Sequence, residues 1–338
     1  MNYNIALQFE DGVSRIIPCN ADELVCDAAY RAKINIPLDC RDGACGTCKS
    51  HCESGEFTMG EYIEDALTDD EAASGYVLTC QMKPTSDCVV RIPASSAACK
   101  TVVGSHGGKL TDIARDSATT VSFSVQAEQP LAFLPGQYVN LQVPGTKETR
   151  SYSFSSAPNQ TQLSFLIRDV PDGLMSTYMR NKAQPDDFMM FTGPYGSFYL
   201  RPTVRPILML AGGTGLAPFL SMLLWLKDNP TTQPIRLAYG VNTNDDLVEL
   251  DTLAEIKSIM PNFEFFTCVV DRESGHPKLG YVTDHLSTGD LHDGSVDVYV
   301  CGPPPMVEGV RKWIAGVGVT PKNFLFEKFS SDNEARTA

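Results

Sequence analysis

Four cysteines in the first quarter of the chain have the spacing of a ligand set. Cys40, Cys45 and Cys48 follow the pattern C-x4-C-x2-C, and Cys80 follows in a separate segment. This spacing is the plant-type signature of a [2Fe–2S] cluster. Two sulfide-bridged irons need four thiolates, so three ligands must curl around the cluster from one loop. The sequence therefore predicts that these four cysteines hold a [2Fe–2S] cluster.

Glycines inside this loop support the same prediction. Gly43 and Gly46 allow tight turns and let backbone N–H groups point at the sulfurs, which stabilises negative charge there. A structural zinc site is the alternative, but zinc prefers C-x2-C pairs to a four-residue gap followed by a two-residue gap. Cys52 lies close to the loop, and we interpret it as a buried thiol rather than a ligand.

A second group of candidate residues begins with the segment Arg150-Ser151-Tyr152-Ser153. Arg150 could pair with a phosphate, Tyr152 could stack on an aromatic ring, and the Ser153 hydroxyl could bond a ring nitrogen. About 20 residues later, Gly173 and Ser176 open an expected helix whose free N–H groups suit a pyrophosphate. An ordinary strand followed by an ordinary helix cap would give the same residues, so this pattern alone leaves both interpretations open.

A third candidate site lies in the last third of the chain. An apolar strand is followed there by a glycine turn and a helix, which lets a phosphate approach the backbone at a helix N-terminus. A later strand ends in Cys301, and Gly302 and Pro303 follow it. By itself Cys301 would be a core cysteine. The turn residues are Gly212, Gly213, Thr214 and Gly215.

The segment 239–246 indicates which nicotinamide cofactor would bind. An NADP-binding protein needs basic residues after this strand to hold the 2′-phosphate, and the segment contains no Arg or Lys. Asp245 and Asp246 would repel a phosphate and could bind ribose hydroxyls instead. These acids could also be plain turn residues. The sequence favours NADH, with Asp245 as the candidate ribose ligand.

Charge and cysteine content narrow the class of protein. Residues 1–98 carry 16 of the 41 acidic side chains, 7 of the 27 basic ones and 8 of the 11 cysteines. An acidic surface argues against nucleic acid as a partner and suits steering toward a basic protein surface, although plain solvation explains it too. Neither an apolar run of 18 residues nor a signal peptide occurs, so we expect no membrane contact and a cytoplasmic location.

Hydrophobic patterning divides the chain into three expected domains. Residues 1–98 hold the cysteine loop, and residues 99–108 form an expected linker of small residues and glycines. Residues 109–204 contain short alternating strands and turn signals, which predict a small antiparallel β-barrel. Residues 205–338 alternate strands with helices, which predicts a parallel sheet covered by helices. The expected fold is multidomain, with α+β and α/β parts.

The three motifs together resemble those of the FAD-binding ferredoxin–NADP reductase superfamily. The resemblance implies that Arg150 and the Gly173-x-x-Ser176 helix hold the FAD phosphates. It also implies that Tyr152 stacks on the isoalloxazine and that Ser153 reaches its N5 atom. FMN-using relatives lack the adenine-side contacts, so FAD is favoured over FMN.

The resemblance extends to the C-terminal segment and to the first domain. It places Cys301 near the reactive carbon of the nicotinamide, and Gly302 and Pro303 at its border. Glu327 matches the acid that family members carry near the C-terminus, and Phe329 matches the aromatic residue, two positions later, that shields the flavin. The first domain resembles a ferredoxin with a β-grasp-like fold. The whole chain resembles the reductase components of aromatic-ring dioxygenases of the benzoate and toluate type.

This resemblance implies a route for electrons. A hydride passes from NADH to FAD, and single electrons then pass through the [2Fe–2S] cluster to a Rieske-type terminal oxygenase. Serving a soluble di-iron monooxygenase, of the phenol or methane hydroxylase type, is the alternative, because the modules look alike. A non-enzymatic redox sensor would bind the same cofactors without turnover.

Overall fold

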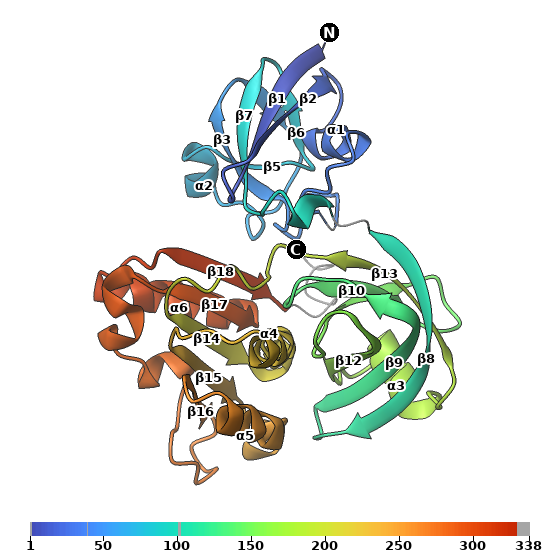
Figure 1. Cartoon of the computed structure of the whole chain (residues 1–338), viewed down its shortest axis with the longest axis vertical. Coiled ribbons are helices and arrows are strands. Elements are labelled where there is room, and N and C mark those ends of the chain that lie inside the picture. Colours follow the sequence, from blue (N-terminus) through green and yellow to red (C-terminus); the bar gives the residue numbers. More distant parts are fainter. Residues whose placement is uncertain (1, 39, 101–102, 330–338) are drawn as a thin grey trace. The chain divides into compact units, whose positions relative to one another are not determined.

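The computed structural model describes residues 2–38, 40–100 and 103–329, which fold into two compact units (Figure 1). The first unit runs to Gly104 and includes Gly193–Ser197, and the second contains Ser105–Thr192 and the chain from Phe198 onward. No helix in these described ranges is both long enough and apolar enough to cross a bilayer.

The first unit is built on a five-stranded mixed sheet. Its strand order is β2-β1-β7-β3-β5, in which β1 and β7 pair in parallel and the other neighbours are antiparallel. Alternate residues of β1, such as Ile5 and Leu7, are fully buried, because successive side chains of a strand face opposite sides. The strands are β1 (Asn2–Phe9), β2 (Ser14–Asn20), β3 (Lys49–Ser54), β5 (Tyr76–Leu78) and β7 (Cys88–Ile92).

Short elements complete this unit and frame the cysteine loop. Strands β4 (Phe57–Met59) and β6 (Met82–Pro84) form a separate two-stranded sheet. Helix α1 (Val25–Arg31) precedes the loop that carries Cys40, Cys45 and Cys48, and Cys80 follows β5. Helix α2 (Asp69–Ala73) starts at a capping box in which Thr68 and Glu71 satisfy each other's backbone N–H groups. A 3₁₀ turn spans Ala98–Lys100.

The second unit begins with a six-stranded sheet that curls into a half-barrel (Figure 1). The strand order is β11-β10-β13-β8-β9-β12, and an isolated antiparallel bridge joins Phe154, just after β11, to Phe165 in β12. The strands and the helix of this part are β8 (Gly104–Arg115), β9 (Thr120–Leu131), β10 (Tyr138–Gln142), β11 (Thr149–Ser153), β12 (Gln160–Arg168), α3 (Leu174–Asn181) and β13 (Phe188–Tyr195). The first residue of β8 and the end of β13 from Gly193 onward are counted with the first unit.

The rest of the second unit is a parallel sheet of five strands with the order β16-β15-β14-β17-β18. The chain order reverses between β14 and β17, which is where open parallel sheets bind ligands at their carboxyl edge. The elements are β14 (Ile207–Gly212), α4 (Ala217–Asp228), β15 (Ile235–Val241), α5 (Leu250–Ile259), β16 (Phe263–Val269), β17 (Asp297–Gly302), α6 (Pro304–Val317) and β18 (Asn323–Lys328). Short 3₁₀ helices span Gly213–Leu216, Asn244–Asp246, Val282–His285 and Thr288–Gly294.

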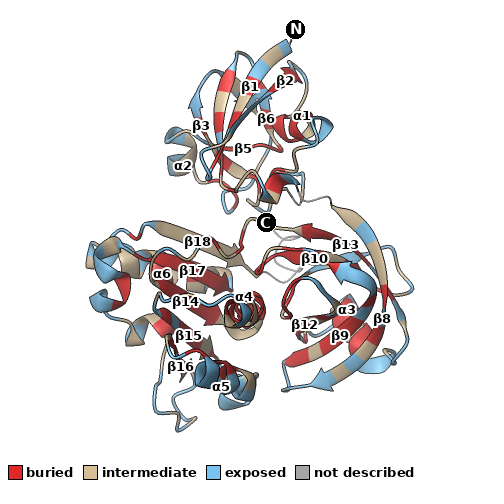
Figure 2. Cartoon of the chain, in the orientation of Figure 1, coloured by how far each residue is buried: buried red, intermediate tan, exposed pale blue. Residues whose placement is uncertain are grey.

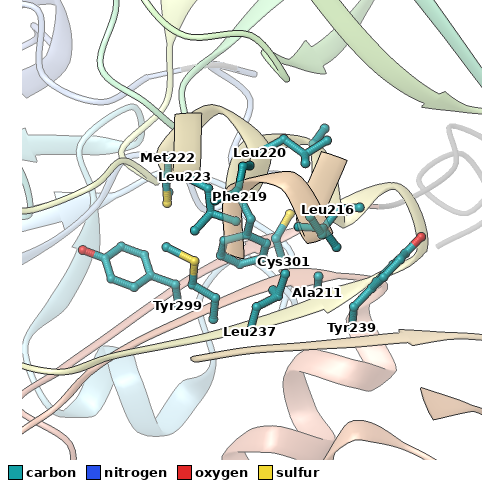
Figure 3. Packing of buried hydrophobic residues seen from close by; sticks show 14 of the residues in the cluster. Ala211, Leu216, Phe219, Leu220, Met222, Leu223, Leu237, Tyr239, Tyr299 and Cys301 are labelled. Atoms are coloured by element: carbon teal, nitrogen blue, oxygen red, sulfur yellow. The ribbon is translucent and has the colours of Figure 1, made fainter. Parts of the chain in front are cut away.

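Both faces of this parallel sheet are buried (Figure 2). Met209 and Ala211 of β14 pack with α4 and α5 on one face, whereas Leu208 and Leu210 pack with α6 on the other. Figure 3 shows the first of these clusters, with Cys301 next to Phe219 of α4. Two-sided burial explains why β14 is a continuous apolar run in the sequence.

One fold prediction differs from the structure in detail. The glycine-rich stretch from Gly104 to Gly108, expected in a linker, is the start of β8. It can pair as a strand because Gly107 lies against Phe188 of β13, where a Cβ would come within 2.5 Å of the Phe188 ring. The second domain contains a curled antiparallel sheet, and its finer description as a small antiparallel β-barrel stays a prediction. The exact domain boundaries stay a prediction.

Candidate functional site

The four predicted cluster ligands are brought together in the first unit. The Cys40 thiol interacts with those of Cys45 and Cys80, and the Cys80 thiol also interacts with that of Cys48. No group of three or more His, Cys, Asp or Glu side chains in the described residues meets the geometry of a metal-ion site. Four soft sulfur donors, three on one loop and one on a neighbouring segment, are the donor set that a [2Fe–2S] cluster takes.

Backbone N–H groups of the loop already face its sulfurs. The Cys45 N–H donates to the Cys40 Sγ at 3.3 Å, and the Thr47 N–H donates to the Cys45 Sγ at 3.5 Å. Such bonds stabilise thiolates. Hydrogen bonding, first with Cys45, lowers the pKa of the Cys40 thiol, whereas hydrogen bonding, first with Cys40, raises the pKa of the Cys80 thiol.

Glycine is required at two positions of this loop. Gly43 has φ of +84°, and a Cβ there would lie 2.5 Å from the carbonyl oxygen of Glu61. Gly46 has φ of +71°, and a Cβ would lie 3.1 Å from the carbonyl oxygen of Ala66. The left-handed backbone and the close approach of the segment Glu61–Ala66 both exclude a side chain. The tight turns predicted at these two glycines therefore have a direct steric cause.

The flavin candidates lie on β11 in the second unit. Arg150 is half-buried, and its Nη1 donates to the carbonyl oxygen of the preceding residue, Thr149, at 2.7 Å. Tyr152 is also half-buried and meets the Phe123 ring edge-on, with 6.5 Å between the ring centroids. Ser153 is buried, with 4% of its surface exposed. Arg150 and Tyr152 share one face of the strand and Ser153 lies on the other, because side chains alternate along a strand.

The helix predicted after Gly173 is α3, and Gly173 occupies its N-cap. Ser176 lies in the first turn of α3 and is 4% exposed. Its hydroxyl accepts from the Val170 N–H at 2.9 Å and approaches the Arg168 carbonyl at 3.4 Å. These contacts hold the loop before α3, so the Ser176 hydroxyl is engaged within the protein. The N-terminus of α3 would offer its backbone N–H groups to an anion.

The glycine turn packs against the end of β17. A Cβ on Gly215 would lie 2.3 Å from the carbonyl oxygen of Cys301, and one on Gly212 would lie 2.5 Å from the Met306 sulfur. Gly302 and Gly212 are similarly close, since a Cβ on Gly302 would lie 3.2 Å from the Gly212 Cα. Gly213 differs, because its φ is +54° and the space at its Cβ is open.

The open space at Gly213 lies where β14 passes into the 3₁₀ turn that precedes α4. Thr214 belongs to this turn. Pro303, which follows the neighbouring strand β17, is the N-cap of α6. Two helix starts therefore face the carboxyl edge of the sheet at the same place. This arrangement suits a dinucleotide, whose phosphates favour helix N-termini.

Cys301, Glu327 and Ser153 meet although they come from three separate segments. Cys301 on β17 pairs with Glu327 on the parallel strand β18. The Ser153 hydroxyl donates to the Glu327 Oε2 at 3.2 Å, which ties the half-barrel to the parallel sheet. Burial, followed by the nearby charge of Glu327, raises the pKa of the Cys301 thiol well above its ordinary value. Cys301 therefore stays a neutral thiol at neutral pH.

Phe329 follows directly after β18. Its backbone N–H donates to the Gly302 carbonyl at 2.9 Å, and its ring packs against the hydrophobic cluster that contains Cys301. The four predicted catalytic residues therefore lie in one region of the second unit. Ser153 contacts Glu327, Glu327 pairs with Cys301, and Phe329 packs against the cluster that contains Cys301.

The two acids predicted after β15 differ in their surroundings. Asp245 is exposed. Asp246 instead caps the short helix, because its Oδ2 accepts from the backbone N–H and the hydroxyl of Thr243 at 3.1 and 2.8 Å. Its other oxygen accepts from the Thr119 hydroxyl of the half-barrel. Asp246 is therefore a structural residue that the sequence pattern did not distinguish, although the T-x-x-D capping signature was present.

Comparison with known families finds three matches along the chain. The 2Fe-2S iron-sulfur cluster binding domain family matches residues 8–85. The oxidoreductase FAD-binding domain family matches residues 108–199, and the oxidoreductase NAD-binding domain family matches residues 209–312. The cysteine loop, the β11 motif and the glycine turn each lie inside the corresponding match.

Whole proteins of similar sequence are also known. The chain is 52% identical over 337 residues to a 2-halobenzoate 1,2-dioxygenase electron transfer component of Burkholderia cepacia, covering 98% of each. It is 50% identical over 334 residues to a toluate 1,2-dioxygenase electron transfer component of Pseudomonas putida, covering 98% of this chain and 99% of the relative. A solved cytochrome P450 reductase of Amycolatopsis shares 30% identity with a TM-score of 0.74, covering 97% of this chain and 99% of that structure.

Proposed function

Since the chain belongs to the family of the 1,2-dioxygenase electron transfer components, we propose that it is the NADH-dependent reductase of an aromatic-ring-hydroxylating dioxygenase. The observation that carries the proposal is one chain that joins a four-thiol loop to a flavin-type half-barrel and a nucleotide-type parallel sheet. When bound, FAD would accept the two electrons of a hydride and the cluster would carry them one at a time.

The residues of the second unit would bring donor and acceptor together. The backbone of Gly212, Gly213, Thr214 and Gly215 would receive the pyrophosphate of NADH, and the exposed Asp245 would bind a ribose hydroxyl. Cys301, Gly302 and Pro303 would border the nicotinamide. Ser153 and Glu327 would supply the polar contacts that orient NADH and FAD toward each other, and Phe329 would exclude water from the place where they meet. Arg150, Tyr152, Gly173 and Ser176 would hold FAD.

The residues of the first unit would hold the cluster. Cys40, Cys45, Cys48 and Cys80 would supply the four thiolates, and the Cys45 and Thr47 N–H groups would stabilise them. The domain would be of the β-grasp type. We further propose that the terminal oxygenase is of the Rieske type, and that it takes its electrons from this unit.

Anaerobic addition of NADH tests the function directly. We expect purified protein to contain acid-labile sulfide and FAD, and to lose visible absorbance at both the flavin and the cluster bands within one turnover. NADPH should act far more weakly, because Asp245 would face its 2′-phosphate. Protein that lacks labile sulfide contradicts the proposal, and protein that carries both cofactors but is not bleached by NADH contradicts it in favour of a sensor without turnover.

The partner is tested by reconstitution. The reduced protein should support turnover by a Rieske dioxygenase that hydroxylates an aromatic carboxylate. A di-iron monooxygenase is the rival partner, and faster electron delivery to such an enzyme than to the dioxygenase would favour it. Both trials use the same NADH-reduced protein, so only the acceptor differs.

Electron delivery to the partner should depend on salt. The segment from Glu61 to Asp70 packs on the cysteine loop, where the Ile63 N–H donates to the Gly43 carbonyl at 3.3 Å. Its exposed acids would attract a basic partner surface, and that attraction is screened over about 8 Å at physiological ionic strength. These acids are Glu61, Glu64, Asp65, Asp69 and Asp70.

We therefore expect the double variant Glu64→Gln, Asp65→Asn to deliver electrons roughly tenfold more slowly at low salt and to show a weaker salt dependence. The rate of electron transfer at limiting oxygenase, measured from low to high ionic strength, checks this. Glu128→Gln, which removes an exposed acid from β9 in the second unit, is the control. Equal salt slopes for the double variant and the native protein would refute the docking role of this segment.

A further inference from the structure

Gln81 lies next to Cys80, the fourth predicted cluster ligand. It contacts both Cys80 and the loop that carries the other three predicted ligands. Its side-chain Nε2 donates to the carbonyl oxygen of Arg41 at 3.3 Å, inside the loop that carries the other three cysteines. The same nitrogen lies 3.9 Å from the Cys80 Sγ. A side-chain amide nitrogen carries two hydrogens, so one group can serve both acceptors.

The position of this amide is built into the fold. The backbone of Gln81 is fixed on both sides, because its N–H donates to Leu78 and its carbonyl accepts from Gly60, each at 2.8 Å. A Cβ on Gly60 would lie 2.3 Å from the Gln81 Oε1, so glycine at that position leaves room for the amide. The Gln81 residue is half-buried.

The acceptor in the loop is held just as firmly. Arg41 has φ of +66°, a left-handed conformation that is unfavourable for a residue with a Cβ. Its guanidinium pairs with Asp27 of α1, and its carbonyl accepts from Gln81. The loop is therefore tied at one residue to α1 by an ion pair and to the Cys80 segment by the Gln81 amide.

We propose that Gln81 is a positioning residue for the [2Fe–2S] cluster, whose amide holds the Cys40 loop against the Cys80 segment and directs an N–H toward the Cys80 sulfur. The proposal rests on the proposed function for the presence of the cluster. Reduction adds a negative charge, so a donor near a ligating sulfur stabilises the reduced form more than the oxidised form. Gln81 should therefore raise the reduction potential of the cluster.

Two substitutions in the full-length holoprotein separate the effects of the donor and of charge. Gln81→Glu keeps the size of the side chain but replaces the amide donor by an anion. We expect it to weaken the preference for the reduced cluster about tenfold, which is about 59 mV more negative for one electron. Gln81→Met removes the donor without adding charge, and its potential should fall between those of the glutamate variant and the native protein.

The measurement is an anaerobic redox titration followed by the EPR signal of the reduced cluster, with labile sulfide confirming that each variant is loaded. Gln8→Glu is the matched control, because it adds the same charge at an exposed position on β1. It should leave both the potential and the EPR signal unchanged. If the glutamate variant assembles no cluster, the methionine variant decides.

Loaded Gln81 variants with the native potential and EPR signal would overturn the proposal, as would an equal shift in Gln8→Glu. Native protein that contains no labile sulfide would instead overturn the proposed function. The two failures are therefore distinguished by one assay on the native protein.

Discussion

Replacing Cys80 by serine is expected to abolish electron delivery to the oxygenase while leaving the flavin reaction intact. Cys80 is 1% exposed, so serine fits its space, but a hard hydroxyl is a poor substitute for a soft thiolate on iron. Loss of an outer contact to a metal site already costs about 10 to 100-fold, so loss of a ligand should cost more than roughly 100-fold. NADH-driven reduction of ferricyanide should persist, because the flavin and nucleotide residues belong to the other unit.

Cys88→Ser is the matched control for this experiment. Cys88 is also 1% exposed and lies in the same unit, on β7. Its thiol contacts that of Cys52 rather than the cysteine loop. Labile sulfide, the cluster absorbance and the rate of cytochrome c reduction should therefore fall in Cys80→Ser and persist in Cys88→Ser. Equal loss in both variants would show that buried thiols of this unit matter for folding rather than for cluster ligation.

The secondary structure was predictable where burial follows a simple period. Residues 205–338 were expected to alternate strands with helices, and β15 (Ile235–Val241) is one of these strands, with side chains buried on both of its faces. The stretch from Gly104 to Gly108 was missed, because its strand depends on contact with β13, about 80 residues later. A glycine-rich segment carries no hydrophobic period, so only its tertiary partner reveals the strand.

The candidate site was predictable in proportion to how local its parts are. Three of the four cluster cysteines lie within nine residues, and their spacing alone describes a loop. Gln81 was not identified, since an amide next to a cysteine has no signature until the fold brings Arg41 to it. Ser153 and Glu327 are 174 residues apart, so their contact could be expected only from the resemblance to known reductases.

Removing the Ser153 hydroxyl should slow the reduction of the flavin by NADH. In the structure this buried hydroxyl donates to the Glu327 Oε2 at 3.2 Å, and Glu327 pairs with Cys301 across β17 and β18. Without it, the carboxylate loses a donor and can turn away from the place where we propose that hydride passes. Loss of one oriented hydrogen bond near reacting atoms costs roughly 100-fold or more, so we expect about that effect on the hydride step in Ser153→Ala.

Stopped-flow measurement of flavin absorbance under anaerobic conditions isolates this step. Glu327→Gln keeps an acceptor for the Ser153 hydroxyl but removes the charge, so its effect should be smaller than that of Ser153→Ala if orientation matters most. Ser151→Ala is the control, because that exposed serine lies two residues away on β11 and its hydroxyl donates to Asn140. Labile sulfide should be unchanged in all three variants, which confines the effect to the second unit.

The kinetic isotope effect with deuterated NADH decides whether the slowed step is the hydride transfer itself. If Ser153 and Glu327 position the reacting pair, the isotope effect should grow in Ser153→Ala, because the chemical step becomes more fully rate-limiting. A slow variant with a reduced isotope effect would place these residues in NADH binding instead. A native rate in Ser153→Ala would mean that the contact between the half-barrel and β18 serves only to hold the two parts of the second unit together.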